Sequence, residues 1–113
     1  MTINRNMQVE PVFLTGSAAI LYTVKASQIL NIDKITAYNS GAGANTVTFY
    51  LVPSGDSAAV INKIIDAKSI NAGETAELTE IAGHTLNADM TIEGLASTTG
   101  EVSVMLSGWV RGQ

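Results

Sequence analysis

The sequence predicts an all-β protein, a single-domain β-sandwich, and three observations support this fold class. The chain is 113 residues long, which leaves room for one hydrophobic core but not for two. Its apolar residues alternate with polar ones at the period of a strand rather than a helix. Turn-forming Gly, Asn and Asp residues interrupt this alternation at short intervals. Seven to eight short antiparallel strands at this spacing favour a jelly-roll-like sandwich.

Two segments carry the clearest alternation, residues 46–52 and residues 101–111. Their expected core-facing side chains are Val47, Phe49, Leu51, Val102, Val104, Leu106 and Val110. Shorter alternating segments lie at residues 75–79 and 90–97. A sheet with one buried face produces this pattern, because successive side chains of a strand point to opposite faces.

Two further strands are expected upstream, at residues 19–25 and 28–39. In the second strand, the apolar residues before Asp33 and those after Lys34 fall on opposite faces. Such a slip predicts either a β-bulge or a strand that crosses between two sheets. Residues 40–45, rich in Gly and Ala, then form a hairpin-like loop.

Residues 57–69 allow two interpretations. Ser57 could cap a helix whose apolar stripe includes Val60, Ile61 and Ile64. Alternatively, the segment is an irregular strand with Ile61 on one side. Extended structure is favoured, because Ile and Val suit a sheet better than a helix.

The N-terminal segment is polar and lacks alternation. We therefore expect an extended arm over residues 1–15 and the sandwich domain over residues 16–113. Residues 1–10 also lack the basic start and apolar core of a secretory signal. The longest uncharged apolar stretch, residues 16–24, is far shorter than the ~20 residues that a membrane helix needs. A soluble protein made in the cytoplasm is expected.

Composition excludes several classes of protein. The net charge is −4, which disfavours duplex DNA or an anionic membrane as the main partner. Only 14% of residues are charged, whereas 46% are hydrophobic; a disordered acidic segment would show the reverse. Such a composition predicts that part of the surface packs against another chain. Because the chain has no cysteine, disulfides, thiolate metal sites and a cysteine nucleophile are excluded.

No catalytic arrangement is predicted. His84 is the one histidine of the chain, it lies in a turn-like context, and no Gly-x-Ser-x-Gly elbow accompanies it. Glu77 and Glu93 fall on the outward sides of their strands, as solvated carboxylates do. Residues 41–43 lack the remaining glycines or the Gly-Lys-Ser/Thr of a phosphate-binding loop. We therefore expect no enzyme activity, cofactor or metal.

The candidate functional residues are apolar side chains expected on outward faces. Met105 and Trp109 lie opposite the core-facing residues of their strand, with Arg111 on the same side. Tyr50 is placed outward on its own strand. Exposed Met and aromatic side chains are typical of protein interfaces. These four residues form the predicted interface, unless both faces of the sheet are covered within the chain or the face is inverted.

Several short runs stand in a characteristic order along the chain: 49–55 (FYLVPSG), 62–65, 70–75 (INAGET), 80–86, 96–98 and 107–108. Together they resemble a group of small structural proteins of tailed bacteriophages. The resemblance covers roughly residues 35–112. The sequence departs from that pattern at Asp56, where a second glycine is expected, and at Thr79 and Glu80, where a proline is missing.

The resemblance implies a virion component without enzymatic activity. Its most specific implication is a capsid decoration, or cement, protein on the outer head shell. The implied partner is the major capsid protein or another virion protein, and a homo-oligomer, preferably a trimer, is expected. Nucleic acid and membrane are not expected as partners.

Other roles stay open at this point. The chain could be a tail, collar or fibre component, or a β-sandwich module that binds a carbohydrate or receptor. A binding module of that kind would group aromatic residues in loops, whereas Phe13, Tyr22, Phe49 and Tyr50 lie in strand-like runs. A small hydrolase that uses His84 is the third alternative.

Overall fold

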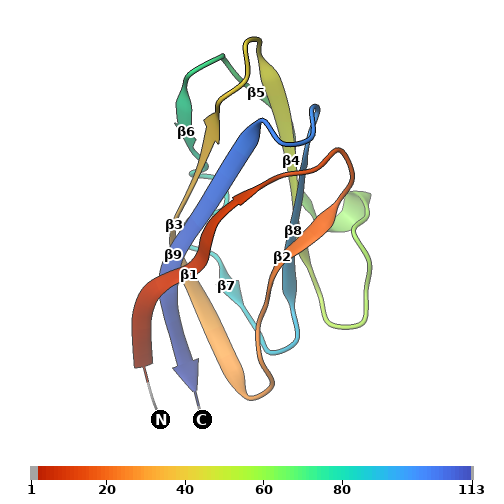
Figure 1. Ribbon diagram of the computed structural model, residues 1–113. Coiled ribbons are helices and arrows are strands. Elements are labelled where there is room, and N and C mark those ends of the chain that lie inside the picture. Colours follow the sequence, from red (N-terminus) through yellow and green to blue (C-terminus); the bar gives the residue numbers. More distant parts are fainter. Residues whose placement is uncertain (1–2, 113) are drawn as a thin grey trace.

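The computed structural model describes the backbone of residues 3–112 and the side chains of residues 7–112. Two antiparallel sheets face each other (Figure 1). The first sheet has the order β1-β9-β3-β6, with β7 also paired to β3, and its strands are β1 (Ile3–Phe13), β9 (Val102–Gly112), β3 (Gln28–Asn39), β6 (Thr75–Glu77) and β7 (Thr85–Leu86). The second has the order β2-β8-β4-β5, with strands β2 (Ala19–Thr23), β8 (Thr91–Ala96), β4 (Asn45–Val52) and β5 (Lys63–Ile70).

The strand order is that of a jelly roll. The first strand pairs with the last, β1 with β9, and the second pairs with the next to last, β2 with β8. Nested inside them, β4 pairs with β5 and β3 pairs with β6. The chain therefore passes repeatedly between the two sheets, which confirms the predicted β-sandwich.

The core lies between the two sheets. Its fully buried larger side chains are Leu14, Leu30, Ile32, Ile35, Phe49, Leu78, Ile81, Leu86, Ile92 and Leu106. Along β9 the burial alternates residue by residue, so the core-facing set predicted for this strand is confirmed. In β4, Val47 and Phe49 are buried as expected, but Leu51 is only partly buried.

Register shifts explain where the simple alternation fails. The pairing of β3 with β9 shifts between Ile32 and Lys34, which confirms the phase slip as a β-bulge. The pairing of β4 with β5 shifts on both sides of Phe49. The end of β4 is therefore rotated, and Val52 rather than Leu51 becomes fully buried.

The N-terminal segment differs from the expected arm. Over Ile3–Phe13 it is a strand that pairs with β9 at the edge of the first sheet. Val9 and Leu14 contribute to the core, so the described part of residues 1–15 belongs to the sandwich. The polar sequence predicted an arm rather than a strand. An edge strand is held by backbone hydrogen bonds and needs few apolar side chains, so it leaves little pattern in the sequence.

The ambiguous segment is mostly extended. After a single 3₁₀ turn, η1 (Val60–Asn62), the chain continues as β5 (Lys63–Ile70). The favoured interpretation of residues 57–69 is therefore correct for its second half. A helix over the whole segment is excluded, because β5 pairs with β4 along its length.

Candidate interaction surfaces

The outward side of the first sheet carries an apolar surface, which we call the outer face. It consists of Met7, Phe13, Lys34, Tyr38, Met105, Trp109 and Arg111. Residues directly opposite each other in an antiparallel pair share a face. Ser103 of β9 lies between Phe13 of β1 and Tyr38 of β3, and Ser107 lies between Met7 and Lys34. The neighbouring strands β1, β9 and β3 thus present these side chains on the same side of the sheet.

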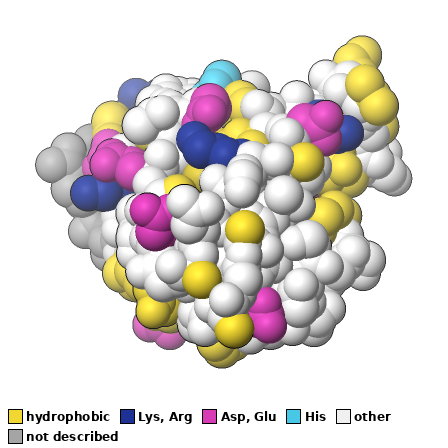
Figure 2. All heavy atoms as spheres, turned by 90° about the horizontal axis from the view of Figure 1, so that it is seen from above, with side chains coloured by type: hydrophobic (Ala, Val, Ile, Leu, Met, Phe, Trp, Pro, Cys, Tyr) yellow, Lys and Arg dark blue, Asp and Glu magenta, His cyan; other side chains and the backbone are white. Residues whose placement is uncertain are grey.

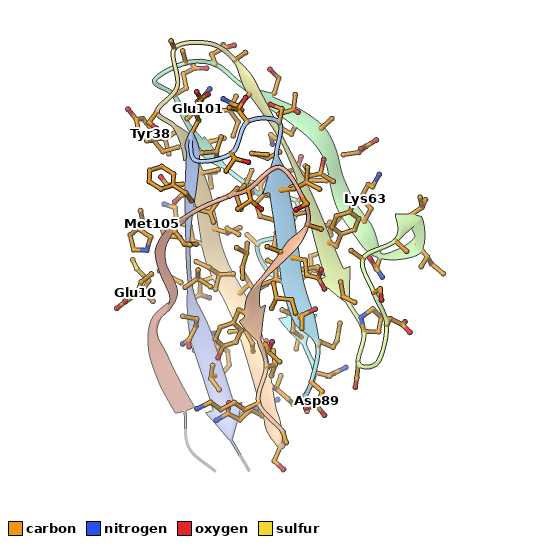
Figure 3. The ribbon with its side chains drawn as sticks, turned by 45° about the vertical axis from the view of Figure 1, so that its right-hand side comes forward. Glu10, Tyr38, Lys63, Asp89, Glu101 and Met105 are labelled. Carbon is orange, nitrogen blue, oxygen red and sulfur yellow. The ribbon has the colours of Figure 1, made fainter. Side chains whose placement is uncertain are left out.

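The exposure of the apolar side chains on the outer face is unusual for a small domain. Met7 is 43% exposed, Phe13 is 54% exposed and Tyr38 is 42% exposed. Met105, in the row between them, and Trp109, one row beyond Met7, are half-buried. Figure 3 shows Tyr38 and Met105 pointing away from the sandwich on the same side. A cluster of this kind is typical of a surface that another protein covers.

The structure divides the four predicted interface residues into two groups. Met105, Trp109 and Arg111 share the outer face, because they alternate with the buried residues of β9. Tyr50 lies on β4 in the other sheet, and the Nζ atom of Lys63 sits 5.9 Å from the centre of its ring. In Figure 3, Lys63 lies on the opposite side of the molecule from Met105. Tyr50 is therefore not part of the same surface.

A second apolar surface was missed from the sequence. Val60 is 84% exposed and Ile61 is 92% exposed, both in the 3₁₀ turn η1 between β4 and β5. We call these two residues the tip. Seen from above, the molecule carries an apolar protrusion on the right (Figure 2), the side on which the short coiled ribbon of η1 lies in Figure 1. From the sequence, Val60 and Ile61 are expected in the apolar stripe of a helix, or Ile61 on one side of an irregular strand.

The tip is braced by the side chain of Asn62. Its Oδ1 accepts a hydrogen bond from the Ala59 N–H at 3.0 Å, and its Nδ2 donates to the Ser57 carbonyl at 3.0 Å. The Asn62 N–H also donates to the Ala59 carbonyl at 3.1 Å. These bonds close a compact loop, so Val60 and Ile61 are held in solvent by fixed geometry.

Polar side chains tie together the end of the sandwich where β3 meets β4. Asn39 and Asn45 are fully buried. Asn39 donates through Nδ2 to the carbonyls of Gly43 and Ile70 at 2.8 and 2.9 Å. Asn45 donates to Glu101 Oε1 at 2.9 Å. All their polar atoms have partners, so this cluster stabilises the fold and leaves no group free for a ligand.

The titratable groups do not converge on a reactive centre. His84 is exposed, and its backbone bonds to Ile81 and Ile32 fix a turn. The pKa of Glu80 is lowered by a hydrogen bond from its own backbone N–H and by Lys68, whose Nζ lies 3.1 Å from Oε1. Burial raises the pKa of Tyr22. Within the part of the chain that the structure describes, no three His, Asp or Glu side chains cluster as metal ligands would.

Among the described residues, no helix is long and apolar enough to cross a lipid bilayer.

Comparison with known proteins shows the fold. No protein-family model and no curated protein matches the chain. A chain of the Bacillus endospore appendages, which form disulfide-linked pili, matches with a TM-score of 0.58 and 17% identity over 98% of this chain and 88% of that chain. A chain of the T13 particle of infectious bursal disease virus matches with a TM-score of 0.50 and 14% identity over 96% of this chain. The alignment spans only 30% of the viral chain. At these identities the likeness establishes a shared architecture and nothing about activity.

Proposed function

We propose that this chain is a non-enzymatic structural protein that acts as one of many copies in a bacteriophage particle, most specifically as a decoration protein of the head shell. The outer face carries the proposal. Met7, Phe13 and Tyr38 expose apolar side chains on one face of the first sheet, which a free monomer gains nothing by keeping. Such a surface fits a protein whose working state is an assembly.

The comparisons support the general class. The two structures compared above come from a pilus and from a virus particle, both of which are assemblies of many copies. The more specific assignment to a tailed phage rests on the sequence runs between residues 49 and 108. In a decoration protein, many weak contacts act together and give a stable shell without any chemistry.

Copies of this chain cannot be linked to one another by disulfide bonds. The similar pili are disulfide-linked, whereas this chain contains no cysteine. Packing of apolar surfaces and pairing of charges are the means that remain. The outer face, with Lys34 and Arg111 among apolar side chains, offers both.

A tail, collar or fibre component is the second candidate, because repeated copies and the same apolar face would serve there equally well. A carbohydrate-binding module is less suited to the structure. All six aromatic residues, Phe13, Tyr22, Tyr38, Phe49, Tyr50 and Trp109, lie in strands rather than in loops.

The test is binding to particles together with the native mass. Recombinant chain is mixed with phage head shells assembled without it and then sedimented, and tail preparations serve as the parallel sample. Saturable binding to shells, with a native mass by light scattering that corresponds to an oligomer such as a trimer, is the expected result. Saturable binding to tails alone would favour the second candidate, and no binding to either would refute a virion role.

A further inference from the structure

We propose that the tip, Val60 and Ile61, docks onto the outer face of a second copy of this chain. The inference rests on the proposed role as one of many copies and names the two surfaces that meet. The first ground is the cost of exposing the tip. Val60 and Ile61 are 84% and 92% exposed, and burying side chains of this type away from water stabilises a protein or a complex. A pair of such residues on a protruding turn gains this stabilisation only when a partner covers it.

The second ground is that the tip is preorganised. The Asn62 side chain holds both ends of the loop through its bonds to Ala59 and Ser57. At the base of the loop, Lys63 Nζ contacts Asp66 at 3.3 Å and lies over the Tyr50 ring. A rigid apolar projection loses little conformational entropy on binding, as a docking element requires.

The third ground is the chemistry of the surroundings, which selects a protein over a lipid surface. The chain has a net charge of −4, and exposed carboxylates of Asp56 and Asp66 flank the tip in sequence. An anionic bilayer would repel these groups. An apolar protein surface that carries a positive charge would accept both the tip and its flanking carboxylates.

The outer face of the same chain has this chemistry. Its exposed Met7, Phe13 and Tyr38 are apolar, and exposed Lys34 projects from the row that contains Ser107 and Met7. Lys34 makes no ion pair with another side chain among residues 7–112. The negative side chains nearby are exposed Asp33, next to Lys34 in the chain, Glu10 on β1, and Glu77 of β6, which lies opposite Thr36. Asp66 contacts Lys63 within its own chain, and Lys34 of a second copy can join this exposed pair when the tip packs beside it.

The two surfaces lie on opposite sides of the sandwich. In Figure 3, Met105 and Tyr38 of the outer face point to one side, and Lys63 at the base of the tip points to the other. The contact is therefore heterologous, between different patches of two copies. A contact of this kind closes into a ring, such as a trimer, or continues as an open chain, depending on the rotation between copies.

Crosslinking tests the contact directly, because the chain has no cysteine of its own. A copy that carries Ile61→Cys is mixed with a copy that carries Ser107→Cys and oxidised gently. The control mixture pairs Ile61→Cys with Ser54→Cys, an exposed loop position away from the outer face. We expect mixed disulfide dimers to form at least about tenfold faster with Ser107→Cys than in the control. Equal rates in the two mixtures, or preferential pairing of Ile61→Cys with itself, would overturn the proposal.

Sedimentation velocity gives an independent measurement. Val60→Ser together with Ile61→Ser should weaken self-association by at least about tenfold, whereas Ile20→Ser, which removes another exposed apolar side chain at the far edge of the second sheet, should not. Lys34→Glu should weaken it as well, and Asp66→Lys should restore association in that background. Loss of shell binding by the tip variant without any change in self-association would assign the tip to the shell protein and overturn the proposal.

The outcomes separate this contact from the proposed function. If the chain self-associates through the tip but binds neither shells nor tails, the virion role fails and the contact stands. If the chain binds shells while the tip variant keeps the native mass of the wild type, the contact fails and the virion role stands.

Discussion

The side-chain amide of Asn45 donates a hydrogen bond of 3.1 Å to the side-chain carbonyl of Asn39, and both residues are fully buried. Asn39 ends β3 and Asn45 begins β4, so this bond joins the two sheets at the loop between them. The side-chain Oδ1 of Asn45 also accepts hydrogen bonds from Ser97 Oγ at 2.9 Å and from the Thr98 N–H at 3.0 Å. One side chain thus connects the end of β3 and the start of β4 to the loop between β8 and β9.

Removal of this connection should destabilise the fold. Asn45→Ala leaves the carbonyl of Asn39 and the carboxylate of Glu101 each without one donor, and it leaves the Thr98 N–H without an acceptor. Unsatisfied buried groups cost about 1–3 kcal/mol, so the free energy of unfolding in urea should fall by an amount in that range. Asn71→Ala, at an exposed turn, serves as the control. A loss no larger than that of the control would contradict this role of Asn45.

The sequence was sufficient to predict those strands whose side chains alternate between the core and solvent. The bounds of β3 and the bulge after Ile32 follow from the phase of the apolar residues, because each side chain of an interior strand is either in the core or out of it. The alternation in β9 correctly placed Met105 and Trp109 on the outward face. Where a residue's position is set by its own burial, local pattern is sufficient.

Contacts between segments that are distant in the chain produce no recognisable pattern in the sequence. The pairing of β1 with β9 depends on backbone hydrogen bonds, so the polar N-terminal residues gave no hint of a strand. The exposure of Val60 and Ile61 depends on the brace from Asn62, and two adjacent β-branched residues ordinarily indicate a core. The separation of Tyr50 from Trp109 depends on which sheet each strand joins, which alternation cannot determine.

Gly94 should resist substitution because Phe49 packs against it. A Cβ atom at position 94 would lie 2.7 Å from the Cε2 atom of the Phe49 ring, which is fully buried in the core. Gly94→Ala should therefore cost about 1–3 kcal/mol by overpacking. Thermal and urea unfolding measure the loss, and Gly43→Ala, where an added Cβ meets no atom within 4 Å, is the matched control.

The same clash predicts a rescue. Phe49→Leu alone should destabilise the core, because it leaves part of the ring's volume empty. In the Gly94→Ala background the smaller side chain gives the new methyl group space, so the two losses should be less than additive. Strict additivity in a double-mutant cycle would show that the two residues do not limit each other.

Ala67 offers a stabilising substitution. It adopts φ 50° in β5, a left-handed conformation that costs an L-residue other than glycine about 1–2 kcal/mol. Its N–H donates to Thr48 Oγ1 at 3.0 Å, so the conformation is held by a specific bond that glycine keeps. Ala67→Gly should raise the unfolding free energy by about 0.5–1 kcal/mol, after the greater entropy of the unfolded chain is subtracted. Ala72→Gly, at an exposed turn residue without positive φ, should instead lower it.

Tyr22 should make stability fall in alkali. Burial raises its pKa above the ordinary value of 10.0, so the unfolded chain releases this proton at lower pH than the folded chain does. The stability is fully present below pH 10.0 and is lost as the pH rises through that value toward the raised pKa of the folded state. Unfolding in urea at pH 8, 10 and 11 should show a smaller decline for Tyr22→Phe than for the wild type. Tyr38→Phe, which changes an exposed ring, should decline as the wild type does.

The fluorescence of Trp109 should report on whether the outer face is covered, because Trp109 is the one tryptophan of the chain. It is half-buried in the free protein, on the side of β9 that faces solvent, so its indole is still in contact with water. When another molecule covers the outer face, the ring loses that water and its emission should move to shorter wavelength. The shift should grow with protein concentration as copies associate, and Val60→Ser with Ile61→Ser should suppress it, because that variant lacks the group that we expect to cover the ring. Emission that stays constant while the mass measured by light scattering rises would show that copies associate through a surface other than the outer face.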